Sequence, residues 1–132
     1  MNAEIPEAYL DLFKKKTFAH LATLMPDGSP QVSPVWIDYD GAYILVNTAK
    51  GRQKDRNMLD RPKVALSILD PDDPYRRLLV RGTIVAQTTE GARAHIDSLA
   101  LRYRGTPKYQ SHRSDEERVI YKIRPEHISA NG

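Results

Sequence analysis

The sequence predicts a mainly β protein, an antiparallel barrel of six strands with helical caps. Short apolar segments of β type alternate with turn residues along most of the 132-residue chain. Two Asp-Gly pairs, Asp27-Gly28 and Asp40-Gly41, separate such segments and indicate hairpins. Only two stretches carry a substantial helical pattern, which disfavours a doubly wound parallel sheet. The length fits one domain over residues 1–132 with a core of its own.

The predicted elements begin with a helix. Apolar residues spaced three and four apart between Ile5 and Phe13 predict a short amphipathic helix over residues 7–16, with Pro6 near its first turn. It should cap one side of the core. The predicted strands are residues 18–24, 31–39, 42–48, 63–69, 75–87 and 118–123.

A second helix is predicted over residues 90–104. Its apolar residues Ala92, Ile96, Leu99 and Tyr103 recur at helical spacing, and Gly105 provides a stop signal. The polar segment 106–117 that follows is predicted to be a loop ordered by a ligand or a partner chain.

Composition limits the function classes. Twenty Lys and Arg against seventeen Asp and Glu give a net charge of +3, which suits a small anionic ligand better than nucleic acid. The absence of cysteine removes disulfides, thiol nucleophiles and thiolate metal sites. No apolar run approaches the length of a membrane helix, so we expect a soluble, cytoplasmic, unprocessed protein.

Residues 48–57 form a basic decapeptide directly after an apolar strand pattern. Lys50, Arg52, Lys54 and Arg56 surround Gly51. A strand that leads through a glycine turn into a helix directs free N–H groups at the space above the helix, and the helix dipole favours an anion there. The pattern fits a phosphate site, but it fits a solvated basic surface as well.

The strand pattern also predicts a partner surface. In residues 18–24, Ala19 and Leu21 alternate with Phe18, Ala22 and Leu24, so both faces are largely apolar. A small barrel cannot bury both faces in its own interior. A two-fold homodimer is the simplest solution.

Seven motifs follow one another in a fixed order along nearly the whole chain. They are residues 22–36, 40–41, 48–57, 61–64, 70–75, 81–82 and 118–126. Together they closely resemble the split-barrel family related to pyridoxamine 5'-phosphate oxidase. Within that family the spacing resembles the small oxidoreductases that use the deazaflavin coenzyme F420, known as PPOX-class F420-dependent enzymes.

The resemblance implies a homodimer of six-stranded split barrels of the FMN-binding type, with two cofactor sites at the interface. It implies that the cofactor phosphate lies against the basic decapeptide and the ring along residues 33–36. It also implies that the second subunit contributes residues around Tyr75 and Arg77. The implied cofactor-binding residues are Ser33, Pro34, Val35, Trp36, Thr48, Lys50, Gly51, Arg52, Gln53, Lys54, Asn57, Tyr75 and Arg77.

Several of these and other residues also have a purely structural interpretation. Trp36 can be a core or dimer-contact residue instead of a cofactor wall, and His20 fits a satisfied interior histidine. Asp72 and Asp73, between prolines, fit turn formation better than catalysis. The histidines are too dispersed to suggest metal ligands, so no metal site is predicted. No catalytic side chain can be named.

The function that the resemblance implies is hydride transfer from F420 to an electron-poor small molecule such as a conjugated alkene, a quinone or a tetrapyrrole-like compound. Two alternatives remain open. One is an FMN-binding oxidoreductase of the same fold. The other is a non-catalytic flavin- or deazaflavin-binding protein.

Overall fold

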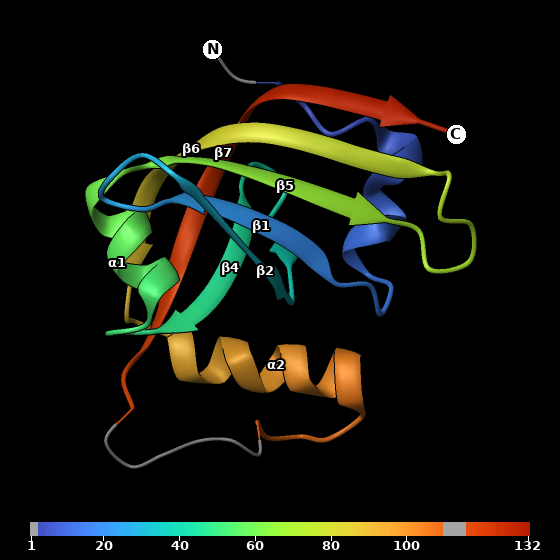
Figure 1. Ribbon diagram of the computed structural model, residues 1–132. Helices are drawn as coiled ribbons and strands as arrows, with labels where there is room; N and C mark the ends of the chain where they lie inside the picture. Colours follow the sequence, from blue (N-terminus) through green and yellow to red (C-terminus); the bar gives the residue numbers. More distant parts are fainter. Residues whose placement is uncertain (1–2, 110–115) are drawn as a thin grey trace.

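In the computed structural model, which describes residues 3–109 and 116–132, the chain forms a curled antiparallel sheet with helices at its ends (Figure 1). The strands are β1 (Ala19–Leu24), β2 (Pro30–Val35), β3 (Asp38–Tyr39), β4 (Ile44–Ala49), β5 (Lys63–Leu69), β6 (Arg77–Thr88) and β7 (Arg118–Asn131). The helices are the 3₁₀ helix η1 (Glu7–Phe13), α1 (Gln53–Asp60) and α2 (Ala92–Arg104).

The strand order shows why the sheet must curl. Neighbours follow the order β2-β1-β5-β6-β7-β4-β3, so β2 and β3 lie at opposite edges. Only Trp36 and Ile37 separate these two strands along the chain. Three Cα–Cα steps span at most about 11 Å, so the two edges have to approach each other. The predicted mainly β, antiparallel barrel with helical caps is confirmed.

The prediction of one strand over residues 31–39 is wrong, because the structure has two strands there, β2 and β3. Trp36 and Ile37 carry the chain around the corner between the two sheet edges, and Ile37 is completely buried there. The described residues therefore hold seven strands where six were predicted.

Two further predictions need correction. The segment predicted as an amphipathic helix over residues 7–16 is a 3₁₀ helix that ends at Phe13, with an i→i+3 bond from Lys14 N to Asp11 O; so short a segment gains little from α-helical cooperativity. The last strand continues past Ile123 to Asn131. Pro125 fits in it because the pairing register shifts beside Gly82, as at a β-bulge.

Gly82 shows how closely β6 and β7 approach each other at this bulge. A side chain there would begin only 2.3 Å from the carbonyl oxygen of Arg124. Only glycine therefore allows the two backbones to pass.

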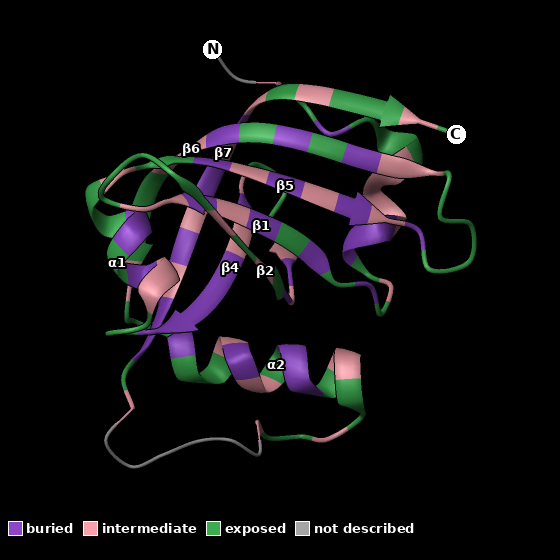
Figure 2. Cartoon of the chain, viewed as in Figure 1, coloured by how far each residue is buried: buried purple, intermediate pink, exposed green. Residues whose placement is uncertain are grey.

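The core fills the inside of the curled sheet (Figure 2). Inward residues such as Leu21, Leu66 and Tyr121 are almost fully buried. α2 packs against β4 and β7 from outside, and it ends at Gly105 with φ +72° as predicted. None of the helices in the described ranges is long and apolar enough to cross a membrane. Part of the predicted loop, residues 110–115, lies outside the described residues.

Candidate cofactor site

The basic decapeptide adopts the predicted strand, glycine turn and helix. Gly51 has φ +93°, a conformation that favours glycine, and Arg52 is the N-cap of α1. The Asp55 carboxylate holds the turn, accepting from Gly51 N at 2.9 Å and from the Tyr121 hydroxyl at 2.6 Å. The first turn of α1 is thereby anchored to the buried middle of β7.

Three cations converge beside this turn. Arg52, Lys54 and Arg118 line one hollow of about 200 Å³, which we call the cationic hollow. Burial, and then the like charges of Arg52 and Arg118, lower the pKa of the Lys54 ammonium below its usual value. Within the described residues, its hydrogen-bond partner is the neutral Ser33 Oγ at 3.3 Å. Arg52 and Arg118 share the carboxylate of Glu116, at 3.5 and 2.9 Å, so an anion placed here would chiefly neutralise Lys54.

Arg118 is held in place by a polar network. Its side chain is only 3% exposed, its Nε donates to Asn47 Oδ1 at 2.9 Å, and its Nη1 donates to Glu116 Oε1 at 2.9 Å. Asn47 is oriented in turn because its Nδ2 group donates to Ala92 O and to His95 Nδ1. His95 Nε2 faces Asp38 Oδ2 at 3.0 Å. This pattern assigns the proton of a neutral His95 to Nε2 and makes Nδ1 an acceptor.

Aromatic residues form the other wall of the cationic hollow. The Trp36 ring stacks on Tyr103 with centroids 5.1 Å apart and an interplanar angle of 8°, and the edge of Tyr109 meets Trp36 at 5.9 Å. Pro34 and Val35 of β2 continue the wall. A flat ring can lie along such a surface while its charged end reaches the cations.

The structure brings together about half of the predicted site residues. Pro34, Val35, Trp36, Arg52 and Lys54 line the cationic hollow, and Ser33 touches it through the Lys54 ammonium. For these residues the structure supplies a common location.

The other residues of the decapeptide have different surroundings. Thr48 is completely buried, and its hydroxyl has no hydrogen-bond partner among the residues that the structure describes. Asn57 is also completely buried, where its amide bonds to Thr23 and Gln53. Lys50 extends toward Glu117 at 3.5 Å. Gly51 shapes the turn itself.

Tyr75 and Arg77 lie away from the cationic hollow. Tyr75 lies in the turn from β5 to β6 and Arg77 is the first residue of β6, at the opposite end of the sheet from α1 (Figure 1). Tyr75 is 79% exposed. Within one chain they do not meet the other predicted site residues, so any role at the site requires a second copy.

Several residues that line the cationic hollow were not predicted from the sequence. They are Phe18, Asn47, Ile96, Arg104, Tyr109 and Arg118. Asn47 carried the clearest signal, because a lone amide within an apolar strand segment needs a specific partner. Arg118 carried none, since its position beside Asn47 depends on the pairing of β4 with β7.

The curled antiparallel sheet, whose edge strands are joined by a two-residue corner, defines a split β-barrel. The chain belongs to the pyridoxamine 5'-phosphate oxidase family, whose model matches residues 5–132. A solved structure described as an F420 reductase is 38% identical in sequence, with a TM-score of 0.84 over 95% of this chain and 98% of that chain. No curated protein matches the chain.

More distant structures share the fold alone. A putative pyridoxamine 5'-phosphate oxidase from Listeria innocua is 20% identical, with a TM-score of 0.71 and 94% and 95% of the two chains covered. The heme storage protein HutZ from Vibrio cholerae is 16% identical, with a TM-score of 0.67 and 98% and 96% covered. The family and the 38% identical structure together support an oxidoreductase of the flavin or deazaflavin kind with a flavin-type cofactor.

Proposed function

We propose that this protein is an F420-dependent oxidoreductase that transfers a hydride to an electron-poor small molecule, such as a conjugated alkene, a quinone or a tetrapyrrole-like compound. The observation that carries the proposal is the half-buried Lys54 ammonium, placed among Arg52 and Arg118 and bonded to a neutral hydroxyl. The 38% identity to an F420 reductase supports the choice of cofactor.

The side chains that line the cationic hollow suit the phosphate of the cofactor and one face of its ring. Arg52 and Lys54 would bind the phosphate, and Arg118 would add a third positive charge at a fixed position. Pro34, Val35 and Trp36 would orient the ring. The bound cofactor would supply the hydride, whereas the side chains bind, orient and exclude water.

An FMN-binding oxidoreductase is the alternative on the same fold, and a non-catalytic flavin- or deazaflavin-binding protein is another. Both cofactors carry a phosphate, so the three cations suit either one. F420 has an anionic oligoglutamate tail, which would bind best to a positively charged surface. Lys50 and Arg56 add positive charge outside the cationic hollow. Parallel titrations with F420 and FMN, read by cofactor fluorescence, distinguish the two.

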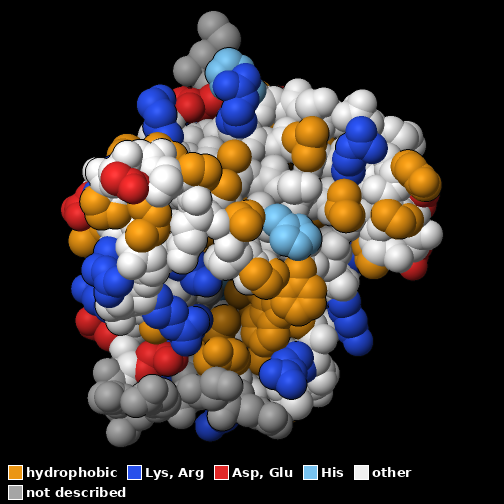
Figure 3. Space-filling view, viewed as in Figure 1, with side chains coloured by type: hydrophobic (Ala, Val, Ile, Leu, Met, Phe, Trp, Pro, Cys, Tyr) orange, Lys and Arg blue, Asp and Glu red, His pale blue; other side chains and the backbone are white. Residues whose placement is uncertain are grey.

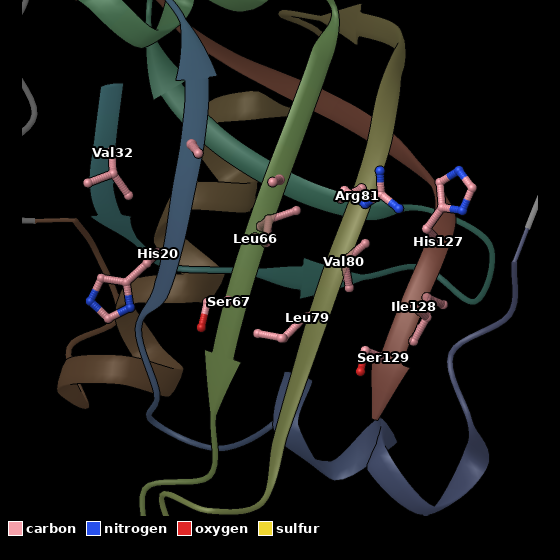
Figure 4. A pocket seen from close by; sticks show the side chains of 12 residues that line it. His20, Val32, Leu66, Ser67, Leu79, Val80, Arg81, His127, Ile128 and Ser129 are labelled. Atoms are coloured by element: carbon pink, nitrogen blue, oxygen red, sulfur yellow. The ribbon is translucent and has the colours of Figure 1, made fainter. Parts of the chain in front are cut away.

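We also propose that the protein acts as a homodimer. The outer face of the sheet carries a hollow of about 540 Å³, which we call the outer-face hollow; Figure 4 shows His20 and Val32 at one side of it and Arg81 and His127 at the other. Val32 is 64% and Leu79 is 40% exposed there. The cationic hollow, at about 200 Å³, is smaller than typical cofactor pockets of about 300–1,000 Å³. A second copy on this face would cover the apolar residues and supply further walls.

The test of the cofactor site is Lys54→Ala. Losing a charge-assisted hydrogen bond of about 1.5–3 kcal/mol should weaken cofactor binding by about one to two decades, with little effect on folding. Arg52→Ala should also weaken binding. The double variant should be non-additive because both cations act on one phosphate.

The matched control is Lys122→Ala. Lys122 lies within β7, pairs with Leu45 of β4 and does not line the cationic hollow. If Lys54→Ala and Lys122→Ala weaken binding equally, or if neither does, the decapeptide is only a solvated basic surface and the proposed site is wrong.

A further inference from the structure

A third hollow, of about 510 Å³, adjoins the cationic hollow. Its lining residues are Lys16, Phe18, Trp36, Tyr103 and Arg104. We call it the aromatic hollow. It shares three lining residues with the cationic hollow. Arg52, Lys54 and Arg118 are not among them. Figure 3 shows a hydrophobic patch on the lower half of this face, with Lys and Arg side chains on either side.

Hydrogen bonds and ring contacts hold the aromatic wall of this hollow in place. The Tyr103 hydroxyl donates to Thr17 O at 2.8 Å and accepts from Ile37 N at 3.3 Å, so both of its hydrogen-bonding roles are used. Trp36 stacks on this fixed ring, and Phe18 meets it at 6.1 Å. Phe18 is nevertheless 52% exposed. A preformed aromatic surface left open to solvent suits a flat aromatic ligand.

The two cations of the aromatic hollow are available to a ligand. Lys16 and Arg104 are exposed, and neither forms an ion pair with any residue in the described parts of the chain. Two cations close to them in the sequence do form ion pairs. Lys15 pairs with Asp70 at 2.9 Å, and Arg102 pairs with Asp38 at 3.3 Å.

We propose that the aromatic hollow is a separate subsite for a planar aromatic carboxylate, which would be the acceptor that binds beside the cofactor. The ring would pack on Phe18 and Trp36, and the carboxylate would lie between Lys16 and the planar guanidinium of Arg104. The role as an acceptor site rests on the proposed function. The binding chemistry does not, because it depends only on these side chains.

The test uses 2-naphthoate as the probe and its neutral analogue 2-naphthalenemethanol. Trp36 is the only tryptophan in the sequence, so its indole N–H gives a single signal in a ¹H–¹⁵N spectrum of the full chain. Titration with 2-naphthoate should shift this signal in a saturable way. The neutral analogue should bind more weakly.

Charge variants test the anchoring. Lys16→Gln and Arg104→Gln should each weaken 2-naphthoate binding by about two- to fivefold, as expected for solvent-exposed charge pairs. The double variant should bind the acid and the alcohol alike. Lys14→Gln, an exposed lysine two residues from Lys16, is the matched control and should change nothing. Equal effects of Lys14→Gln and Lys16→Gln, or no preference for the acid in the unmodified protein, would overturn the proposal.

A second arm separates this subsite from the cofactor site. The titration is repeated with protein saturated with F420 and, separately, with FMN. Retained or tighter 2-naphthoate binding supports a distinct subsite, whereas competitive displacement means that the aromatic hollow belongs to the cofactor and overturns the proposal. If neither cofactor binds but 2-naphthoate still depends on Lys16 and Arg104, the proposed function fails and the binding site stands.

Discussion

Arg118 and Lys54 are both partly or fully buried cations, but their surroundings differ in kind. Arg118 has an acid, Glu116, and an oriented amide, Asn47, to hold it. Lys54 has a neutral hydroxyl. The first arrangement fixes a charge in position, and the second leaves a charge that a ligand can neutralise.

His95 is the residue that orients Asn47, and its replacement gives a prediction at this scale. His95→Phe removes the acceptor for one Asn47 N–H, so Asn47 loses its orientation and Arg118 its anchor. One such hydrogen bond contributes about 0.5–1.5 kcal/mol, so cofactor affinity should fall by about two- to tenfold. The measurement is a fluorescence titration with F420 or FMN.

The conservative variant distinguishes positioning from general loss of structure. In His95→Asn the side-chain oxygen can take the place of Nδ1, so cofactor binding should recover at least in part. If His95→Asn binds no better than His95→Phe while both proteins are folded, the proposed positioning role is wrong.

At the scale of elements, an ion-pair network attaches η1 to the turn between β5 and β6. Asp70, whose side chain is 5% exposed, accepts from Lys15 Nζ at 2.9 Å and from Arg76 Nη1 at 2.8 Å. Arg76 also reaches Asp11 in η1 at 2.7 Å. The backbone N–H of Asp72, together with Lys15 and Arg76, holds the pKa of the Asp70 carboxyl well below its usual range.

This lowered pKa predicts how stability depends on pH. A carboxyl with a lower pKa in the folded than in the unfolded chain stabilises the fold above its unfolded pKa of about 3.9, and this stabilisation is lost as the pH falls through the folded pKa. Asp70→Asn should therefore lower Tm at pH 7 by several degrees, and the difference should shrink below about pH 4. Thermal unfolding followed by circular dichroism measures both effects.

The control for this prediction is Asp72→Asn. Asp72 pairs with the same lysine, but its side chain is 79% exposed. Screening by solvent should keep its effect small. A similar loss of Tm in the two variants would show that Asp70 does not have the structural role assigned to it.

At the scale of the whole molecule, the prediction is the proposed dimer. Light scattering at micromolar concentration should give about twice the chain mass of 15.0 kDa. Leu79→Glu places a charge in the outer-face hollow and should give a folded monomer with weaker cofactor binding. Leu101→Glu, at an exposed leucine of α2 outside that hollow, should remain dimeric. A monomeric unmodified protein with intact secondary structure would contradict the dimer model.

Local signals in the sequence predicted much of the fold. The Asp-Gly pairs marked hairpins, helical spacing marked α2, and Gly105 marked its end. The division of residues 31–39 was not predictable in the same way. Each half has a local β pattern, and only the closure of the sheet requires a corner at Trp36 and Ile37.

For the candidate site, the sequence by itself determined the glycine turn at Gly51, the cations of the decapeptide and the strand beside them, because these features depend on neighbours along the chain. Only the tertiary structure decided which cations converge. Arg118 is 64 residues from Lys54 in sequence and reaches it through the pairing of β4 with β7, whereas Asn57 and Thr48 turn into the core. Hydrophobic burial and strand pairing across the whole sheet decide which side chains converge and which are buried. No local pattern in the sequence predicts this outcome.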